Sequence, residues 1–104
     1  MNKYESVIVI NPKLDEQEID NIIQKVKEIV EQDGTLTQVD KKGIKKLAYE
    51  INKCKEGYFI YFYYETDPSL IANIERYFRI NGDILKFITL KRDDEGDSIN
   101  GINE

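Results

Sequence analysis

The run "YFIYFYYET" at residues 58–66 constrains the fold more than any other part of this 104-residue sequence. Aromatic and β-branched residues favour strands, and successive side chains of a strand point to opposite faces of the sheet. One alternating set contains the only aliphatic residue of the run, and we expect this set to face the core: Tyr58, Ile60, Phe62 and Tyr64. The other set is expected on the opposite, open face: Phe59, Tyr61 and Tyr63. The run therefore predicts a sheet that is covered on one face only.

Two amphipathic segments can supply that cover. Asp15 followed by Glu18 resembles a capping box and predicts the start of a first helix, and Asp33-Gly34 predicts its end. Its apolar residues recur at spacings of three and four: Ile19, Ile22, Ile23, Val26, Ile29 and Val30. Asp67-Pro68 supplies an N-cap and a first helical residue for a second helix, which Asn81-Gly82 ends. The apolar face of the second helix is Leu70, Ile71, Ile74, Tyr77 and Phe78.

Three further segments have the pattern of strands, at residues 4–10, 35–51 and 84–90. Gly43 lies near the middle of the longest of them and predicts a bulge or a bend there. The polar residues 52–57 predict the turn of a hairpin. The element order is then β-α-β-β-α-β. We predict an α+β, ferredoxin-like fold, in which a four-stranded antiparallel sheet carries two helices on one face.

The net charge of −5 conceals an uneven distribution. Residues 93–104 hold five acids and no base, and the first 92 residues hold 15 acids and 15 bases. We therefore predict a single ferredoxin-like domain at residues 1–92 and an acidic, disordered tail at residues 93–104. Within the domain, residues 41–55 hold six lysines against Glu50 alone. This basic segment is the main candidate for a functional surface.

Catalysis has little support in the sequence. Histidine, the commonest general base and metal ligand, is absent. Cys54 lies between two lysines, but no base is at hand to activate its thiol. No phosphate-binding glycine loop or metal-ligand spacing occurs, so we expect no catalytic, cofactor-binding or metal-binding residues. A single cysteine and the lack of a membrane-spanning apolar run point to the cytoplasm.

The lysine cluster and the open aromatic face admit more than one interpretation. Charged residues can merely protect an edge strand from aggregation, or they can contact phosphates of a nucleic acid. The candidate phosphate contacts are Lys41, Lys42, Lys45, Lys46, Lys53 and Lys55. The aromatic residues Phe59, Tyr61 and Tyr63 could stack on bases or dock a protein. They could also have no binding role and simply add surface to a partly solvated sheet face. The basic-Gly-aromatic pattern of RNA-recognition domains is absent, which weakens the stacking interpretation.

Several motifs together resemble a known family. Tyr4-Glu5 opens the first strand and Asn11-Pro12 follows it, and Gly57-Tyr58-Phe59 opens the third strand. The most specific block is "GIKKLAYEI" at Gly43–Ile51, and "FRINGDI" at Phe78–Ile84 follows the second helix. In order and spacing, residues 3–91 resemble the bacterial small-subunit ribosomal protein number six.

The resemblance implies a structural, non-catalytic protein of the ribosome that binds the central domain of 16S rRNA. It also implies a heterodimer with a basic partner, small-subunit protein number eighteen. Carried over by position, the family's basic pair matches Lys45 and Lys46, with Tyr49 further along the strand. Further basic positions match Lys53 and Arg79, and Lys3 stands where arginine is frequent. With the cluster named above, the predicted rRNA-binding set is Lys3, Lys41, Lys42, Lys45, Lys46, Tyr49, Lys53, Lys55 and Arg79, and the predicted partner-binding set is Phe59, Tyr61 and Tyr63.

Two other functions remain open on the same scaffold. One is a small acylphosphatase-like hydrolase, which needs an arginine cradle beside a backbone anion site. The arginines of this chain are Arg76, Arg79 and Arg92, and none lies between the first strand and the first helix. The other is a regulatory dimer that pairs through its sheet face, whereas we expect a monomer in isolation.

Overall fold

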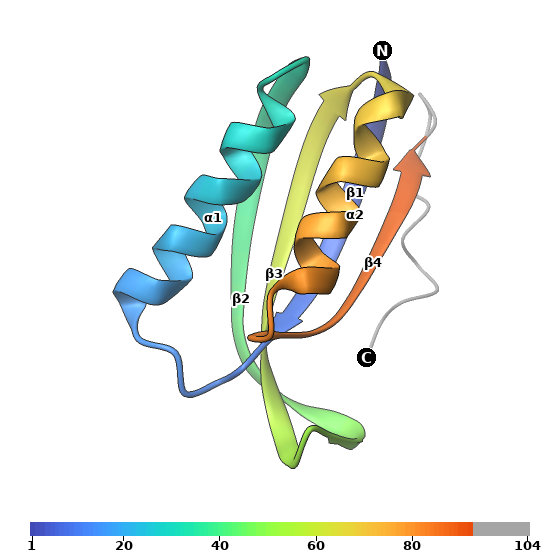
Figure 1. Cartoon of the computed structure of the whole chain (residues 1–104). Coiled ribbons are helices and arrows are strands. Elements are labelled where there is room, and N and C mark those ends of the chain that lie inside the picture. Colours follow the sequence, from blue (N-terminus) through green and yellow to red (C-terminus); the bar gives the residue numbers. More distant parts are fainter. Residues whose placement is uncertain (93–104) are drawn as a thin grey trace.

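The computed structural model describes residues 1–92, and the predicted acidic tail lies outside the described residues (Figure 1). The elements are β1 (Asn2–Ile10), α1 (Glu16–Val30), β2 (Gly34–Ile51), β3 (Cys54–Thr66), the 3₁₀ turn η1 (Pro68–Leu70), α2 (Ile71–Ile80) and β4 (Ile84–Arg92). The strands form one antiparallel sheet in the order β2-β3-β1-β4. Both helices lie on the same face of it (Figure 1). The predicted ferredoxin-like α+β fold is confirmed.

The main core fills the space between the helices and the sheet. The predicted inward set of β3 belongs to it, because Ile60, Phe62 and Tyr64 are almost fully buried and Tyr58 packs against them. From α1 the buried residues are Ile19, Ile22, Val26, Ile29 and Val30, with Ile23 partly buried. From η1 and α2 they are Leu70, Ile74 and Phe78, with Ile71 and Tyr77 packed against the core. The periodicity thus predicted the buried faces correctly.

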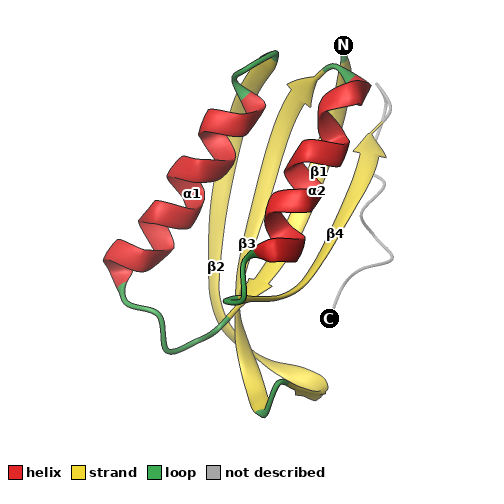
Figure 2. Ribbon diagram, viewed as in Figure 1, coloured by secondary structure: helices red, strands yellow, loops and turns green. Residues whose placement is uncertain are grey.

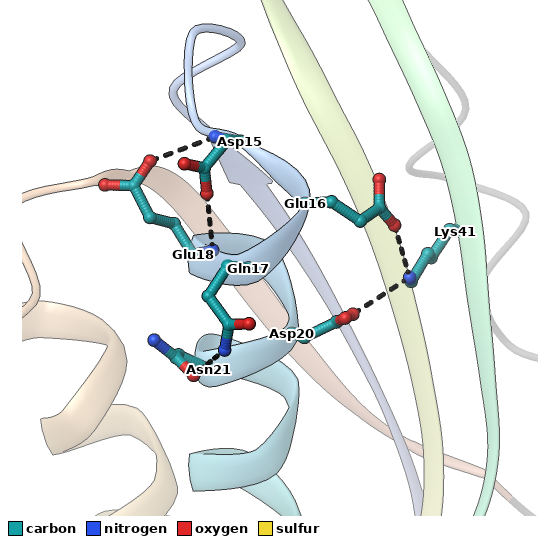
Figure 3. Close-up of polar contacts among 7 residues, drawn as sticks. All are labelled: Asp15, Glu16, Gln17, Glu18, Asp20, Asn21 and Lys41. Atoms are coloured by element: carbon teal, nitrogen blue, oxygen red, sulfur yellow. Dashed lines mark hydrogen bonds and ion pairs between the residues drawn. The ribbon is translucent and has the colours of Figure 1, made fainter.

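The start of α1 agrees with the sequence, but its end does not. The Asp15 carboxylate accepts a hydrogen bond from the backbone N–H of Glu18 at 2.8 Å, and the Glu18 carboxylate accepts one from the backbone N–H of Asp15 at 2.9 Å (Figure 3). The helix ends at Val30, before the expected Asp33-Gly34. Gly34 instead begins β2, where an added Cβ would overlap the Glu65 carbonyl oxygen. Gly34 is needed for close strand approach rather than as a helix cap.

The second helix starts as predicted, with a tight first turn. The Asp67 carboxylate accepts a hydrogen bond from the backbone N–H of Ser69 at 2.9 Å and caps the 3₁₀ turn that leads into α2. This bond to the charged form lowers the pKa of Asp67. The helix ends at Ile80 with Asn81 as its C-cap.

The β2–β3 hairpin is bulged and bent, as Gly43 predicted. The pairing register shifts between Lys41 and Gly43, and Gly43 has a φ of 86° that glycine adopts readily. The hairpin turns at Asn52 and Lys53, both with positive φ. Its far end extends beyond the helices and twists away from the rest of the sheet (Figure 2). No helix within residues 1–92 is long and apolar enough to cross a bilayer.

Candidate nucleic-acid interface

The sheet face opposite α1 and α2, which we call the second face, carries its own apolar layer. Buried residues from β1 and β3 form its centre: Val7, Val9, Phe59 and Tyr61. Leu47, Tyr63, Leu85 and Ile88 pack around them and are partly buried. Phe59 and Tyr61 thus lie on the predicted side of the sheet. The expectation that they are open is wrong, because only 6% of Phe59 and 8% of Tyr61 is exposed.

Besides these apolar neighbours, long side chains from β2 contribute to this burial. The ammonium of Lys42 lies 5.3 Å from the ring centroid of Tyr61, and that of Lys45 lies 5.6 Å from the ring centroid of Phe59. Lysine can cover an apolar surface with its methylene stem while its charge stays in solvent, and the ring face attracts the cation. Two residues of the predicted basic cluster therefore cover two residues of the predicted aromatic set.

Strand β4 adds two cations that the sequence analysis did not select. Lys86 donates a hydrogen bond to the hydroxyl of Tyr49 at 3.4 Å, and its ammonium lies 5.5 Å from that ring's centroid. The guanidinium of Arg92 lies 5.5 Å from the ring centroid of Tyr63. Since β2 and β4 are opposite edges of the sheet, the contact with Tyr49 means that the end of the hairpin reaches across the second face. Alternation along β4 could have shown Lys86 and Arg92, but it could not have shown that contact.

A buried acid lies beneath Arg92. Glu5 of β1 is 1% exposed, and its Oε1 lies 3.7 Å from Nε of Arg92. The pKa of Tyr63 is raised to about 12, mainly because the side chain is partly buried. The negative charge of Glu5 and a hydrogen bond with Glu5 raise it further. Glu5, Tyr63 and Arg92 therefore form one polar group at the end of an otherwise apolar layer. The arrangement gives Glu5 of the Tyr4-Glu5 motif a structural role.

The structure separates Lys41 from the other lysines. Its ammonium lies 3.1 Å from Oε2 of Glu16 and 3.1 Å from Oδ1 of Asp20, both on α1 (Figure 3). Hydrogen bonds to Asp20 and then Glu16 raise the pKa of Lys41. Lys41 thus faces the helices and ties β2 to α1, whereas Lys42 and Lys45 lie on the second face.

The remaining predicted residues fall into three places. At the end of the hairpin, Lys46, Lys53 and Lys55 are exposed, and Tyr49 is 62% exposed. Lys3 is exposed on β1, opposite Arg92 and Glu65 in the pairing register. Arg79 is exposed on α2, where its guanidinium lies 5.8 Å from the ring centroid of Phe87. Arg79 therefore lies on the helix side, apart from the others.

A hollow of about 220 Å³ lies beside the polar group of Glu5, Tyr63 and Arg92. Its lining residues are Lys3, Tyr4, Thr37, Tyr63, Tyr64, Glu65 and Arg92. Nowhere in residues 1–92 do three histidine, cysteine or acidic side chains gather as a metal site would require. Cys54 is half-buried at the start of β3 rather than in the turn.

The fold and this face define a class of protein. The chain is a small ferredoxin-like α+β protein with cations arranged over the rings of its helix-free sheet face. Comparison with known families then gives the particular family. The chain belongs to the ribosomal protein S6 family, whose model matches residues 3–91. It is thus a protein of the small ribosomal subunit, in a family of ribosomal structural proteins rather than enzymes.

Relatives from several bacteria support this assignment. The chain is 42% identical to small ribosomal subunit protein bS6 of Sulfurimonas denitrificans, over 89% of this chain and 69% of that protein. It is 39% identical to bS6 of Helicobacter acinonychis, over 89% of this chain and 66% of the relative. It is 35% identical to bS6 of Desulforamulus reducens, over 88% of this chain and 97% of the relative. The chain therefore spans about two thirds of the first two relatives and nearly all of the third.

A solved structure agrees with the fold. The crystal structure of 30S ribosomal protein S6 from Thermotoga maritima superposes with a TM-score of 0.81 at 32% identity. The match covers 88% of this chain and 87% of the other.

Proposed function

We propose that this protein is a structural component of the small ribosomal subunit that binds the central domain of 16S rRNA. The observation that supports the proposal is the row of cations on the second face, where Lys42, Lys45, Lys86 and Arg92 each lie over an aromatic ring. Cations that contact RNA phosphates release counterions, which favours binding at low salt. Lys46, Lys53 and Lys55 at the end of the hairpin are exposed as well, with Lys46 pointing to the opposite face from Lys45.

The positions of the predicted residues in the fold favour some of the proposed rRNA contacts over others. Lys41 is engaged by two carboxylates of α1, so we assign it a structural role. Arg79 lies on the helix side, and we place it outside the rRNA surface. Lys3 keeps its proposed role, since it is exposed at the end of the second face. Lys86 and Arg92 join the proposed contacts.

We further propose that small-subunit protein number eighteen binds beside the rRNA, as the family resemblance implies. Acids offset part of the positive charge on the second face. Oδ2 of Asp40 lies 3.8 Å from Nζ of Lys42, and Oε1 of Glu5 lies 3.7 Å from Nε of Arg92. Affinity for rRNA alone is then modest, and a second protein would add to it. Of the predicted partner contacts, Tyr63 is the most accessible, because Phe59 and Tyr61 are covered. The site of action is the bacterial cytoplasm, where ribosomes work.

A binding titration tests the proposal. The affinity of the protein for a central-domain rRNA fragment is measured against salt concentration, with and without protein eighteen. Lys45→Ala with Lys46→Ala should weaken binding and reduce the magnitude of the log–log salt slope by about 1 for each phosphate that is no longer neutralised. Lys25→Ala with Lys27→Ala, on the exposed side of α1, is the matched control. An unchanged affinity and slope in the Lys45 and Lys46 variant would refute their phosphate role.

The hydrolase alternative receives no support from the geometry. The loop between β1 and α1 holds no arginine. Arg76 and Arg79 lie on α2, and Arg92 lies at the far end of β4 over Tyr63. These side chains do not form the cradle that acyl-phosphate hydrolysis needs.

A further inference from the structure

The β2–β3 hairpin is interrupted by a bulge before its turn. Lys46 pairs with Glu56, and the next pair is Ile51 with Cys54. Residues 47–50 of β2 therefore face a single residue of β3, and a bulge of this kind disrupts the ladder locally. The turn beyond the bulge is tight, since two residues join Ile51 to Cys54. The hairpin can therefore bend at residues 47–50 more readily than at its turn.

Two side chains of the bulge contact the second face. Leu47 packs against the apolar layer of that face. Nζ of Lys86 donates a hydrogen bond to the hydroxyl of Tyr49 at 3.4 Å, and the same ammonium lies 5.5 Å from the centroid of the Tyr49 ring. Lys86 belongs to β4, the edge strand opposite β2. The contact between Tyr49 and Lys86 thus ties the bulge to the far edge of the sheet.

The hairpin tip, residues 51–55, carries charge beyond the bulge. Its lysines, Lys53 and Lys55, are exposed. For them to bind the same RNA as the lysines of the second face, the two groups must be held in a fixed relative position. A segment that becomes ordered only on binding lowers the affinity, whereas a contact that orders it beforehand avoids this loss. The contact between Tyr49 and Lys86 lies where such ordering is needed.

We propose that Tyr49 is a positioning residue for rRNA binding, whose contact with Lys86 holds the hairpin tip in a fixed place beside the second face. The inference rests on the proposed function. It gives Tyr49 a role other than the direct rRNA contact that the family resemblance implies. Lys86 lies over the Tyr49 ring, so less of that ring is open to a base.

The first experiment needs no RNA. Backbone order parameters of residues 47–55 are measured by ¹⁵N relaxation in the full chain, where values of about 0.85 indicate a rigid backbone and values below about 0.6 a flexible one. Tyr49→Leu and Lys86→Met should each lower these order parameters towards the flexible range. Tyr49→Phe keeps a ring beneath the ammonium and should stay close to the wild type. Ile44→Ala is the control, because this 53% exposed side chain lies opposite Tyr58, on the other face of β2.

The second experiment measures binding of a central-domain rRNA fragment by fluorescence anisotropy over a series of salt concentrations. Tyr49→Leu should weaken binding roughly three- to tenfold, as expected when a segment must be ordered on binding. The salt slope should stay unchanged, because no cation is removed.

A double-mutant cycle separates positioning from direct contact. Lys53→Gln with Lys55→Gln removes the charges that Tyr49 is proposed to position. In that background Tyr49→Leu should weaken binding by less than about twofold, because there is little left to position. Thermal unfolding of every variant checks that the fold is intact.

The outcomes separate this inference from the proposed function. Order parameters that Tyr49→Leu leaves unchanged would overturn the positioning role. An equal loss of affinity from Tyr49→Leu with and without the two tip lysines would show that Tyr49 contacts rRNA directly, and it would overturn the inference while leaving RNA binding in place. Failure of the wild-type chain to bind the fragment, even at low salt, would count against the proposed function and the inference together.

Discussion

Gly57→Ala offers a sharp test of the packing beneath the second face. Gly57 lies in β3 two residues before Phe59, on the same face of the strand, and it is buried. A Cβ at this position would overlap Cγ1 of Val9, while Cδ2 of Leu47 would lie 3.5 Å away in ordinary contact. The backbone of Gly57 is outside the positive-φ region, so the cost of an alanine comes from space alone.

The size of the destabilisation depends on how far the Val9 side chain can move away from the added methyl group. Val9 is 4% exposed, and a β-branched side chain has few alternative rotamers. Overpacking by one methyl group typically costs about 1–3 kcal/mol. Replacing glycine with alanine also restricts the unfolded chain, which offsets about 0.4–1 kcal/mol. We expect Gly57→Ala to lower the free energy of unfolding by about 1–2 kcal/mol.

Urea denaturation followed by circular dichroism measures this difference. A double-mutant cycle with Val9→Ala isolates the overlap, because truncating Val9 makes room for the new methyl group. In the Val9→Ala background, Gly57→Ala should cost at least about 1 kcal/mol less than in the wild type. Gly82→Ala is the control, since no atom lies within 4 Å of its added Cβ. If Gly57→Ala is neutral, or if Val9→Ala does not relieve its cost, the described contact between β3 and Val9 is wrong.

Three further predictions concern the bulge, an ion pair and high pH. Gly43→Ala should destabilise the protein by about 1–2 kcal/mol in urea denaturation, because φ is 86° although no atom crowds the added Cβ. Lys41→Met should cost no more than about 1 kcal/mol, since the ammonium is partly exposed, and the loss should shrink when urea titrations are repeated in about 1 M salt. The pKa values of Tyr63 and Tyr64 are raised from 10.0 to about 12, in both cases mainly by burial. Their folded-state pKa values exceed the unfolded ones, so the stability they contribute is complete below about pH 10 and is lost as the pH rises towards 12. Urea titrations at stepped alkaline pH should show this decline, and Tyr64→Phe should reduce it.

The fold could be predicted from the sequence because its determinants are local. The helix stripes, the capping box at Asp15 and the alternation in β3 each depend on residues a few positions apart, and the structure confirms all three. The predicted end of α1 failed for the opposite reason. A glycine after a helix has the same local pattern whether it caps the helix or admits a neighbouring strand. Only the pairing of Gly34 with Thr66 of β3 decides between the two.

The exposure of the aromatic residues depended on contacts between segments far apart in the sequence. Alternation in β3 correctly placed Phe59 and Tyr61 on the face opposite the helices. Whether their rings are exposed to solvent depends on which side chains of the neighbouring strands pack on them. Part of that cover comes from Lys42 and Lys45, more than ten residues earlier in the chain, and part from Leu47, Leu85 and Ile88. No local pattern in the aromatic run contains this information.

The bulge at Gly43 decides which lysines act together. Strict alternation along β2 would put Lys41 and Lys45 on one face and Lys42 on the other. The register shift between Lys41 and Gly43 inserts one extra residue, which reverses the facing of the following side chains as far as the next register shift after Lys46. Lys42 and Lys45 consequently share the second face, while Lys41 pairs with acids of α1. A count of lysines reports how much charge a strand carries, but a single bulge determines which of those charges can meet the same ligand.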